Sequence, residues 1–134
     1  MSRLRVLLAE DHQTVAALLR RLLEIECDVV AVVADGHSLV AAVDRLKPDV
    51  IVADITMPGC DGLAATVAIL SRWAAARIVL VTVRDEPPIV RKAIALGVLG
   101  FVVKEDASEE LLNAVRAAQV GQPYLSRSVR TVLL

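Results

Sequence analysis

The chain has 134 residues, enough for one domain with a substantial core, because chains split into several domains mostly above about 250 residues. Hydrophobic residues make up 56% of the sequence and aromatic residues only 2%, which excludes a disordered chain and disfavours a protein that stacks nucleic-acid bases on exposed rings. The formal net charge is −1 and no basic run stands out, so the electrostatic footprint of a DNA- or RNA-binding domain is missing.

Short apolar runs alternate along the chain with segments in which apolar residues recur at helical spacing. Continuous apolar runs separated by helices are typical of a parallel sheet that is covered by helices on both faces, with right-handed crossovers. A further amphipathic helical segment begins near Tyr124 and extends to Leu134. We expect strands at 4–9, 29–33, 50–53, 78–83 and 101–103, and helices within 15–23, 39–46, 63–70, 87–97 and 107–121.

The two cysteines, Cys27 and Cys60, are too few for a disulfide framework or a zinc site, and we interpret them as reduced thiols. No apolar run approaches the roughly 18 to 20 residues of a membrane span. Residues 2–5 lead directly into a short apolar run and then into charges, which is unlike a signal peptide. These features predict a cytoplasmic protein without membrane contact.

Four of the expected strands end on residues with reactive chemistry. Glu10 and Asp11 follow the first strand, Asp54 follows the third, Thr82 lies at the end of the fourth, and Lys104 follows the fifth. In an open α/β sheet, ligands bind outside the carboxyl ends of the strands, where the strand order reverses. If the order is 2-1-3-4-5, the three carboxylates converge there, and the threonine and the lysine flank them.

Such a group of side chains is suited to phosphoryl transfer. Three neighbouring carboxylates repel one another unless a cation is present, and Mg²⁺ prefers carboxylate, water and phosphate oxygens. Lys104 adds a fixed positive charge, Thr82 adds a hydroxyl donor, and a carboxylate can act as the nucleophile. Taken singly, Asp11 could cap a helix and Lys104 could be a solvated charge, and His12 is expected to be a surface or capping residue.

The motifs that contain these residues resemble the receiver domains of two-component response regulators. They are LLAEDH at 7–12, DITMPGCDG at 54–62, LVT at 80–82 and GFVVK at 100–104, and the resemblance covers residues 4 to 121. It implies a flavodoxin-like (CheY-like), doubly wound, five-stranded parallel sheet in the order 2-1-3-4-5. The segments 104–111 and 121–126 resemble more narrowly the NarL/FixJ subfamily, whose members carry a LuxR-type helix-turn-helix domain after the receiver.

The resemblance also implies a role for each residue at the strand ends. Asp54 is the phospho-acceptor and a ligand of Mg²⁺, Asp11 is a direct metal ligand, and Glu10 assists it. The backbone carbonyl of Thr56 completes the protein's share of the metal shell. Glu10 stands where most members of the family have aspartate, which lengthens that arm by one methylene.

Further positions imply a switch. Lys104 pairs with the phosphoryl group, Thr82 donates a hydrogen bond to it, and Phe101 is the aromatic residue whose position follows Thr82. Thr56 and Arg84 occupy two variable positions that tune the lifetime of the acyl phosphate in this family.

We therefore expect residues 1–121 to be a receiver that accepts a phosphoryl group from a sensor histidine kinase and dimerises on activation. It is a signalling domain rather than an enzyme, since it catalyses only its own phosphorylation and dephosphorylation. We expect residues 122–134 to begin a linker helix to a C-terminal helix-turn-helix domain, and DNA to be contacted only through that domain.

Three alternatives are open. The first is a haloacid-dehalogenase-type phosphatase, but that chemistry needs a second acid two residues after the nucleophile, where Thr56 stands. The second is a pseudo-receiver that keeps the fold and acts by protein–protein interaction without taking phosphate. The third is a single-domain receiver whose last helix folds back on the body.

Overall fold

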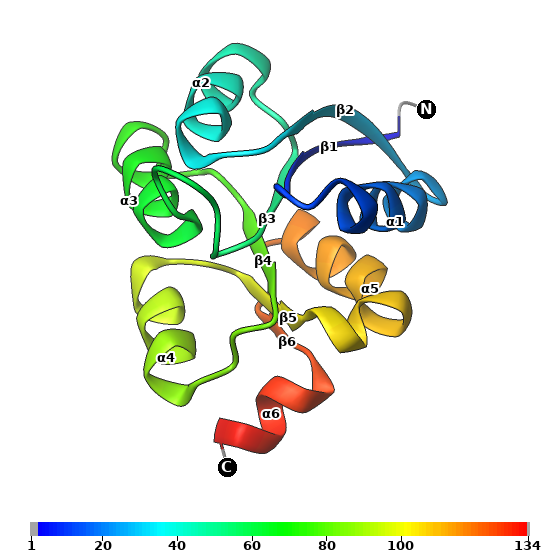
Figure 1. The fold of residues 1–134 in the computed structure, drawn as a ribbon, viewed down its shortest axis with the longest axis vertical. Helices are drawn as coiled ribbons and strands as arrows, with labels where there is room; N and C mark the ends of the chain where they lie inside the picture. The colour runs from blue at the N-terminus through cyan, green and yellow to red at the C-terminus, as the bar shows by residue number, and fades with distance from the viewer. Residues whose placement is uncertain (1–2, 134) are drawn as a thin grey trace.

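The computed structural model describes residues 3–133, which form a six-stranded parallel sheet with helices on both faces (Figure 1). The sheet has the order β2-β1-β3-β4-β5-β6. Among these residues, no helix combines the length and the apolar character that crossing a membrane requires. The elements are β1 (Leu4–Ala9), α1 (Gln13–Glu24), β2 (Cys27–Val33), α2 (Gly36–Leu46), β3 (Val50–Ala53), α3 (Gly62–Arg72), β4 (Ile78–Thr82), α4 (Pro87–Leu96), β5 (Gly100–Val103), the 3₁₀ turn η1 (Lys104–Asp106), α5 (Ala107–Gln119), β6 (Tyr124–Leu125) and α6 (Arg127–Leu133).

The five predicted strands and their order 2-1-3-4-5 are confirmed, and each neighbouring pair is parallel. The strands β3, β4 and β5 are buried along their whole length, which explains why they read as continuous apolar runs. The second strand begins at Cys27, two residues earlier than expected.

The prediction of one helical segment from Tyr124 onwards is wrong, because the chain first adds a sixth strand. Gly100 pairs with Tyr124 and Phe101 pairs with Leu125, and α6 begins only at Arg127. The outer edge of β5 would otherwise present unpaired backbone groups, and such groups need partners. The Tyr124 N–H donates to the Leu99 carbonyl at 2.9 Å, and the Ser126 N–H donates to the Phe101 carbonyl at 3.0 Å.

Two hydrophobic layers cover the sheet. The helices α1 and α5 pack on one face, and α2, α3 and α4 pack on the other (Figure 1). The side chains of β1 alternate between the layers: Val6 and Leu8 contact the α1–α5 layer, whereas Leu7 and Ala9 contact the other. The helix α6 joins the second layer through Val129, whose side chain is fully buried.

The fold also holds the loop after β3 close to the end of that strand. A Cβ atom at Gly62 would lie 2.1 Å from the Asp54 carbonyl oxygen, so only glycine fits there. The Gly62 N–H donates to the Ile55 carbonyl at 2.7 Å. The side chain of Asp61 then caps α3 by accepting the Ala64 N–H at 2.8 Å. The turn from Asp54 into α3 is therefore short and fixed.

Replacing Gly62→Ala should lower the free energy of unfolding by about 3 kcal/mol, because the added methyl collides with backbone and not with a flexible side chain. Urea unfolding measures the change. Gly121→Ala is the matched control. Gly121 has a φ of +74° and nothing within 4 Å of an added Cβ, so backbone strain alone should lower the free energy of unfolding by only about 1 kcal/mol. Equal losses in the two variants would contradict this account of the turn.

Candidate functional site

The site lies at the carboxyl edge of the sheet, where β1, β3, β4 and β5 end. Glu10 and Asp11 follow β1 directly, and Asp54 follows β3. Thr82 is the last residue of β4, and Lys104 is the first residue after β5. Because β1 and β3 are neighbours across the reversal of strand order, the sheet brings together groups that are far apart in the sequence.

Lys104 is the centre of the site. Its Nζ lies 2.7 Å from Glu10 Oε1 and 2.8 Å from Asp54 Oδ2. Glu10 and Asp54 are both buried, with 2% and 4% of their surface exposed. Burial lowers the pKa of Lys104, but hydrogen bonds and Coulombic attraction from Asp54 and Glu10 outweigh it, so the pKa lies above its ordinary value. The lysine is therefore cationic at neutral pH and balances one of the two buried negative charges.

Asp54 has a different partner for each of its carboxylate oxygens. Oδ2 binds Lys104, and Oδ1 accepts the backbone N–H of Thr56 at 3.3 Å. The predicted neighbour Thr82 is fully buried, but its hydroxyl accepts the Arg84 N–H at 3.2 Å. The structure therefore brings together Glu10, Asp54 and Lys104 as predicted, and it turns the hydroxyl of Thr82 toward its own loop.

The acidic pair at the end of β1 has the donor set of a cation site. One ligand atom from each of Glu10, Asp11 and His12 lies within 4.8 Å of the other two. Asp11 Oδ1 is buried and accepts no hydrogen bond among the described residues. An unsatisfied buried carboxylate oxygen beside a second carboxylate suits a hard cation such as Mg²⁺. Asp54 and the Thr56 carbonyl are outside this group of three, and their role as metal ligands stays a prediction.

His12 is the residue whose place in the site the sequence reasoning missed. It occupies the cap position of α1, yet its side chain makes no capping hydrogen bond. Its Nδ1 lies 3.4 Å from both Glu10 Oε2 and Asp11 Oδ1, and the side chain is 70% exposed. Its position directly after the acidic pair was the available signal.

The remaining predicted residues lie around this centre. Phe101 is 1% exposed and belongs to the same hydrophobic cluster as Val90 and Val129. Thr56 and Arg84 are exposed, on the loops after β3 and β4. Arg84 places its Nη2 3.3 Å from Glu86 Oε1. The phenylalanine is therefore in the core beneath the site, whereas the two variable positions lie at its rim.

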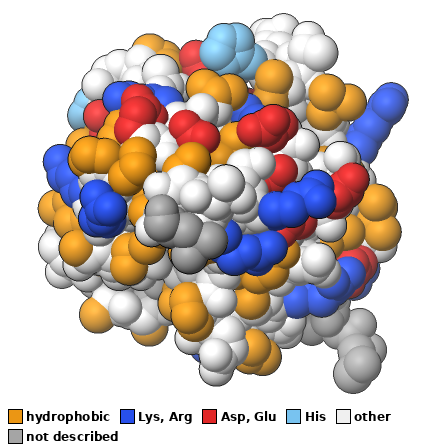
Figure 2. Space-filling model, turned by 90° about the horizontal axis from the view of Figure 1, so that it is seen from below, with side chains coloured by type: hydrophobic (Ala, Val, Ile, Leu, Met, Phe, Trp, Pro, Cys, Tyr) orange, Lys and Arg blue, Asp and Glu red, His pale blue; other side chains and the backbone are white. Residues whose placement is uncertain are grey.

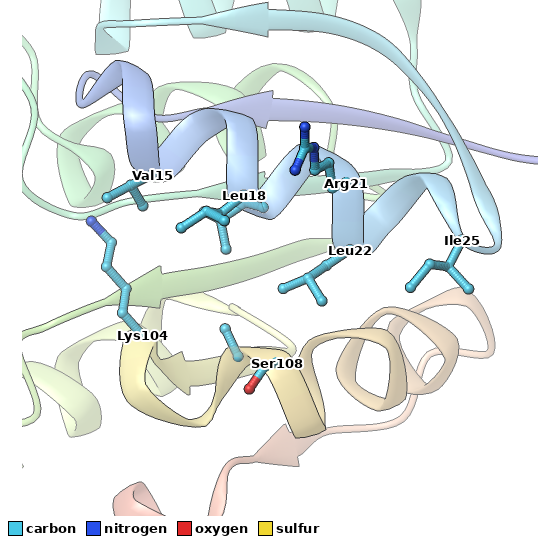
Figure 3. Close-up of a pocket in the computed structure, with 9 residues that line it drawn as sticks. Val15, Leu18, Arg21, Leu22, Ile25, Lys104 and Ser108 are labelled. Atoms are coloured by element: carbon cyan, nitrogen blue, oxygen red, sulfur yellow. The ribbon is translucent and has the colours of Figure 1, made fainter.

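An apolar groove opens beside the site, between α1 and the start of α5 (Figure 3). It has a volume of about 430 Å³ and is lined mainly by Val15, Leu18, Leu22 and Ile25, with Lys104 at one end. The side chains of Leu18 and Ile25 are 56% and 67% exposed. A strip of exposed apolar surface therefore leads up to the lysine that binds Asp54.

The chain is similar in sequence to known regulatory proteins of bacteria. The chain is 35% identical over 122 residues to the transcriptional regulatory protein YxjL of Bacillus subtilis (strain 168), covering 90% of this chain and 56% of that protein. The chain thus spans about half the length of that relative.

Solved structures are also similar. A LuxR-family two-component response regulator from Aurantimonas sp. SI85-9A1 superposes with a TM-score of 0.94 at 32% identity, covering 98% of this chain and 96% of that one. The RcsB response regulator of Salmonella typhimurium, described for its DNA interaction, gives a TM-score of 0.91 at 28% identity and covers 99% and 68%. The family model of the response regulator receiver domain matches residues 6–116, and the chain therefore belongs to that family.

Proposed function

We propose that this chain accepts a phosphoryl group from a sensor histidine kinase on Asp54, in a Mg²⁺-dependent step, and that the modification changes its output surface. The observation that carries the proposal is the position of Lys104, whose Nζ is within 2.8 Å of both Asp54 and Glu10. A fixed cation beside a buried carboxylate is the arrangement that phosphoryl transfer requires, because the protein's part in that reaction is positioning and charge neutralisation.

In the transfer step, a carboxylate oxygen of Asp54 attacks the phosphorus of a phosphohistidine. The new P–O bond forms as the P–N bond breaks, and the imidazole nitrogen leaves with the electron pair of that bond. Lys104 Nζ lies beside the Asp54 carboxylate, so it can neutralise negative charge first on that carboxylate and then on the phosphoryl oxygens. The Thr56 N–H, which Asp54 Oδ1 accepts at 3.3 Å, orients the carboxylate.

Glu10 and Asp11 would hold the Mg²⁺ ion, with Asp54 and the Thr56 carbonyl completing the protein's share. When bound, the ion neutralises charge that develops on the phosphoryl oxygens. The unsatisfied Asp11 Oδ1 supports this assignment. The buried Glu10 also contacts Lys104, so it shares its charge between the lysine and the metal position.

The groove beside Lys104 supports a protein as the phosphoryl donor. A small donor needs only access to Asp54, whereas a protein must also be held in register with it. Exposed Leu18 and Ile25 line the groove that has Lys104 at one end, and they offer apolar contacts to a helix that carries the phosphohistidine. The partner proposed for this groove is the histidine kinase.

Thr82 and Phe101 are proposed as the switch. Phosphorylation adds about −1.5 to −2 charges at Asp54, which draws the Thr82 hydroxyl away from the Arg84 N–H and toward the phosphoryl group. Phe101 then follows into the space that the threonine leaves, as a shift between two populated states. Thr56 and Arg84, exposed at the rim, are proposed to set the lifetime of the acyl phosphate by controlling the approach of water.

The whole regulator is proposed to act on transcription, in the cytoplasm, with residues 1–121 as its receiver and 122–134 leading toward a helix-turn-helix domain. Activation is proposed to produce a homodimer. DNA contact is assigned to the second domain, because the formal net charge of this chain is −1 and, on the face that Figure 2 shows, Lys and Arg side chains are interspersed with Asp and Glu. A helix-turn-helix surface needs gathered positive charge for phosphate contacts.

Incubation with acetyl phosphate and Mg²⁺ should add one phosphoryl group to the chain, and Asp54→Asn should gain none. Mass spectrometry of the intact protein measures the product. Asp85→Asn, on the loop after β4, is the matched control and should label normally. Labelling that survives EDTA would contradict the metal assignment, and labelling of Asp54→Asn would contradict the acceptor.

Leu18→Ser should slow phosphoryl transfer from the cognate histidine kinase by about tenfold, because it removes an exposed apolar contact beside Lys104. A panel of purified kinases from the same genome identifies the donor by transfer to Asp54. Val67→Ser, on α3 and 50% exposed, is the control for helix propensity and should transfer normally. Acetyl phosphate should label all three proteins equally. Equal kinase rates for Leu18→Ser and the unmodified chain would show that the groove is not the docking surface.

Thr82→Ala should still accept phosphate, because Thr82 holds neither the metal position nor Asp54. Its backbone response should be reduced by at least about half, since the hydroxyl that follows the phosphoryl group is gone. Amide chemical shifts of Phe101 and Val103, recorded with and without beryllofluoride and Mg²⁺, measure that response. Thr66→Ala, another buried threonine, should respond fully. Shifts confined to the loops around Asp54 in the unmodified chain would rule out the switch.

A further inference from the structure

The last helix, α6, is bonded to the turn that begins with Lys104. The backbone N–H of Ser128 donates to Asp106 Oδ2 at 3.0 Å, and the Ser128 hydroxyl donates to Asp106 Oδ1 at 3.0 Å. Asp106 is the third residue of η1, and Lys104 is the first. The short turn η1 therefore begins with Lys104, which binds Asp54, and ends with Asp106, which binds α6.

A second carboxylate completes the attachment. Glu110 Oε2 accepts the Arg127 N–H at 2.9 Å, and Glu110 Oε1 accepts the Tyr124 hydroxyl at 2.7 Å. The first backbone N–H groups of a helix have no partner within the helix, and negative charge stabilises that end. A helix of seven residues is marginal by itself, so α6 depends on contacts with the rest of the domain, and Asp106 and Glu110 supply the polar ones at its start.

The apolar contacts of α6 involve the predicted switch residue. Val129 is fully buried in the cluster that contains Phe101, and Leu125 pairs with Phe101 across the sheet. The Val103 N–H donates to the Ser126 hydroxyl at 3.1 Å, one residue before Lys104. Both ends of the segment from Phe101 to Asp106 thus contact β6 or α6.

Asp106 is ionised at neutral pH. Burial raises the pKa of its carboxyl, but hydrogen bonds from Ser126 and Ser128 outweigh burial, and the pKa lies below the ordinary value. The bonds to Ser128 are therefore charge-assisted, and each is stronger than a bond between neutral groups.

We propose that α6 responds to the phosphorylation of Asp54 through Asp106. The helix is docked on the unphosphorylated receiver, and its hydrogen bonds to Asp106 weaken when Asp54 is phosphorylated. The direction follows from the geometry, because Asp106 accepts two hydrogen bonds from Ser128 at once, and a displaced turn would no longer align both carboxylate oxygens with their donors. A phosphoryl group moves the partner of Lys104, and η1 transmits that displacement over three residues. The inference rests on the proposed function of Asp54.

The test is amide hydrogen exchange, followed by NMR, in the full chain with and without beryllofluoride and Mg²⁺. In the unmodified protein, the analogue should raise the exchange rate of the Ser128 amide about fivefold or more, the lower range of allosteric couplings. Asp106→Asn should exchange about tenfold faster before any analogue is added, because a charged hydrogen bond is lost. The further increase with the analogue should then be small. Ser128→Ala keeps the backbone bond and removes one hydroxyl, so it should give an intermediate result.

Glu109→Gln is the matched control. It removes a contact of 3.7 Å with Arg127 between two exposed side chains, and it should leave both rates unchanged. If beryllofluoride shifts the amides around Asp54 but leaves Ser128 exchange unchanged, the inference is overturned and the proposed function stands. If Asp106→Asn responds to the analogue as fully as the unmodified chain, Asp106 is not the link. If the amides around Asp54 do not shift at all, the proposed function fails and the inference falls with it.

Discussion

The contact of one lysine with two buried carboxylates is the interaction on which the site depends. Glu10 and Asp54 are almost completely withdrawn from water, and two such charges side by side are expensive without a cation. Lys104 meets this requirement only because β5 ends where β1 and β3 end. The strand order is therefore part of the chemistry, since it places the ends of β1, β3 and β5 at one edge, where Lys104 reaches both carboxylates.

The arrangement also leaves charge that the protein does not balance. Lys104 supplies one positive charge for Glu10 and Asp54, and Asp11 adds a third carboxylate with an unsatisfied buried oxygen. His12 can add a charge only when protonated, and it is largely exposed. A site with this imbalance favours a divalent cation, and with the cation present it favours an anion such as a phosphoryl group. Burial and its two partners therefore fix the position of Asp54, while the site keeps an excess of negative charge.

Much of this could be predicted from the sequence because the relevant signals are local. Each buried strand is a continuous apolar run, and the reactive residues come directly after the runs, so Glu10, Asp54 and Lys104 could be placed at one edge of the sheet. The direction of the Thr82 hydroxyl could not be predicted, because it depends on where the folded loop places the Arg84 N–H that the hydroxyl accepts. The strand β6 was missed because two residues are too few to show an alternating pattern.

That the last helix folds back on the body was one of the alternatives from the sequence, but its bonds to Asp106 could not be predicted, and the reason bears on how the domain is built. Asp106 occupies the N-cap position of α5, yet its side chain makes no capping bond to that helix and instead accepts the Ser128 N–H. The unpaired edge of β5 needed a partner, and β6 supplied one by bonding to the backbone of Leu99 and Phe101. Only Ser126 separates β6 from α6. Once β6 is paired with β5, α6 must therefore start beside η1, which follows β5 directly. Closing the edge of the sheet and bringing the last helix to the site are therefore consequences of the same strand.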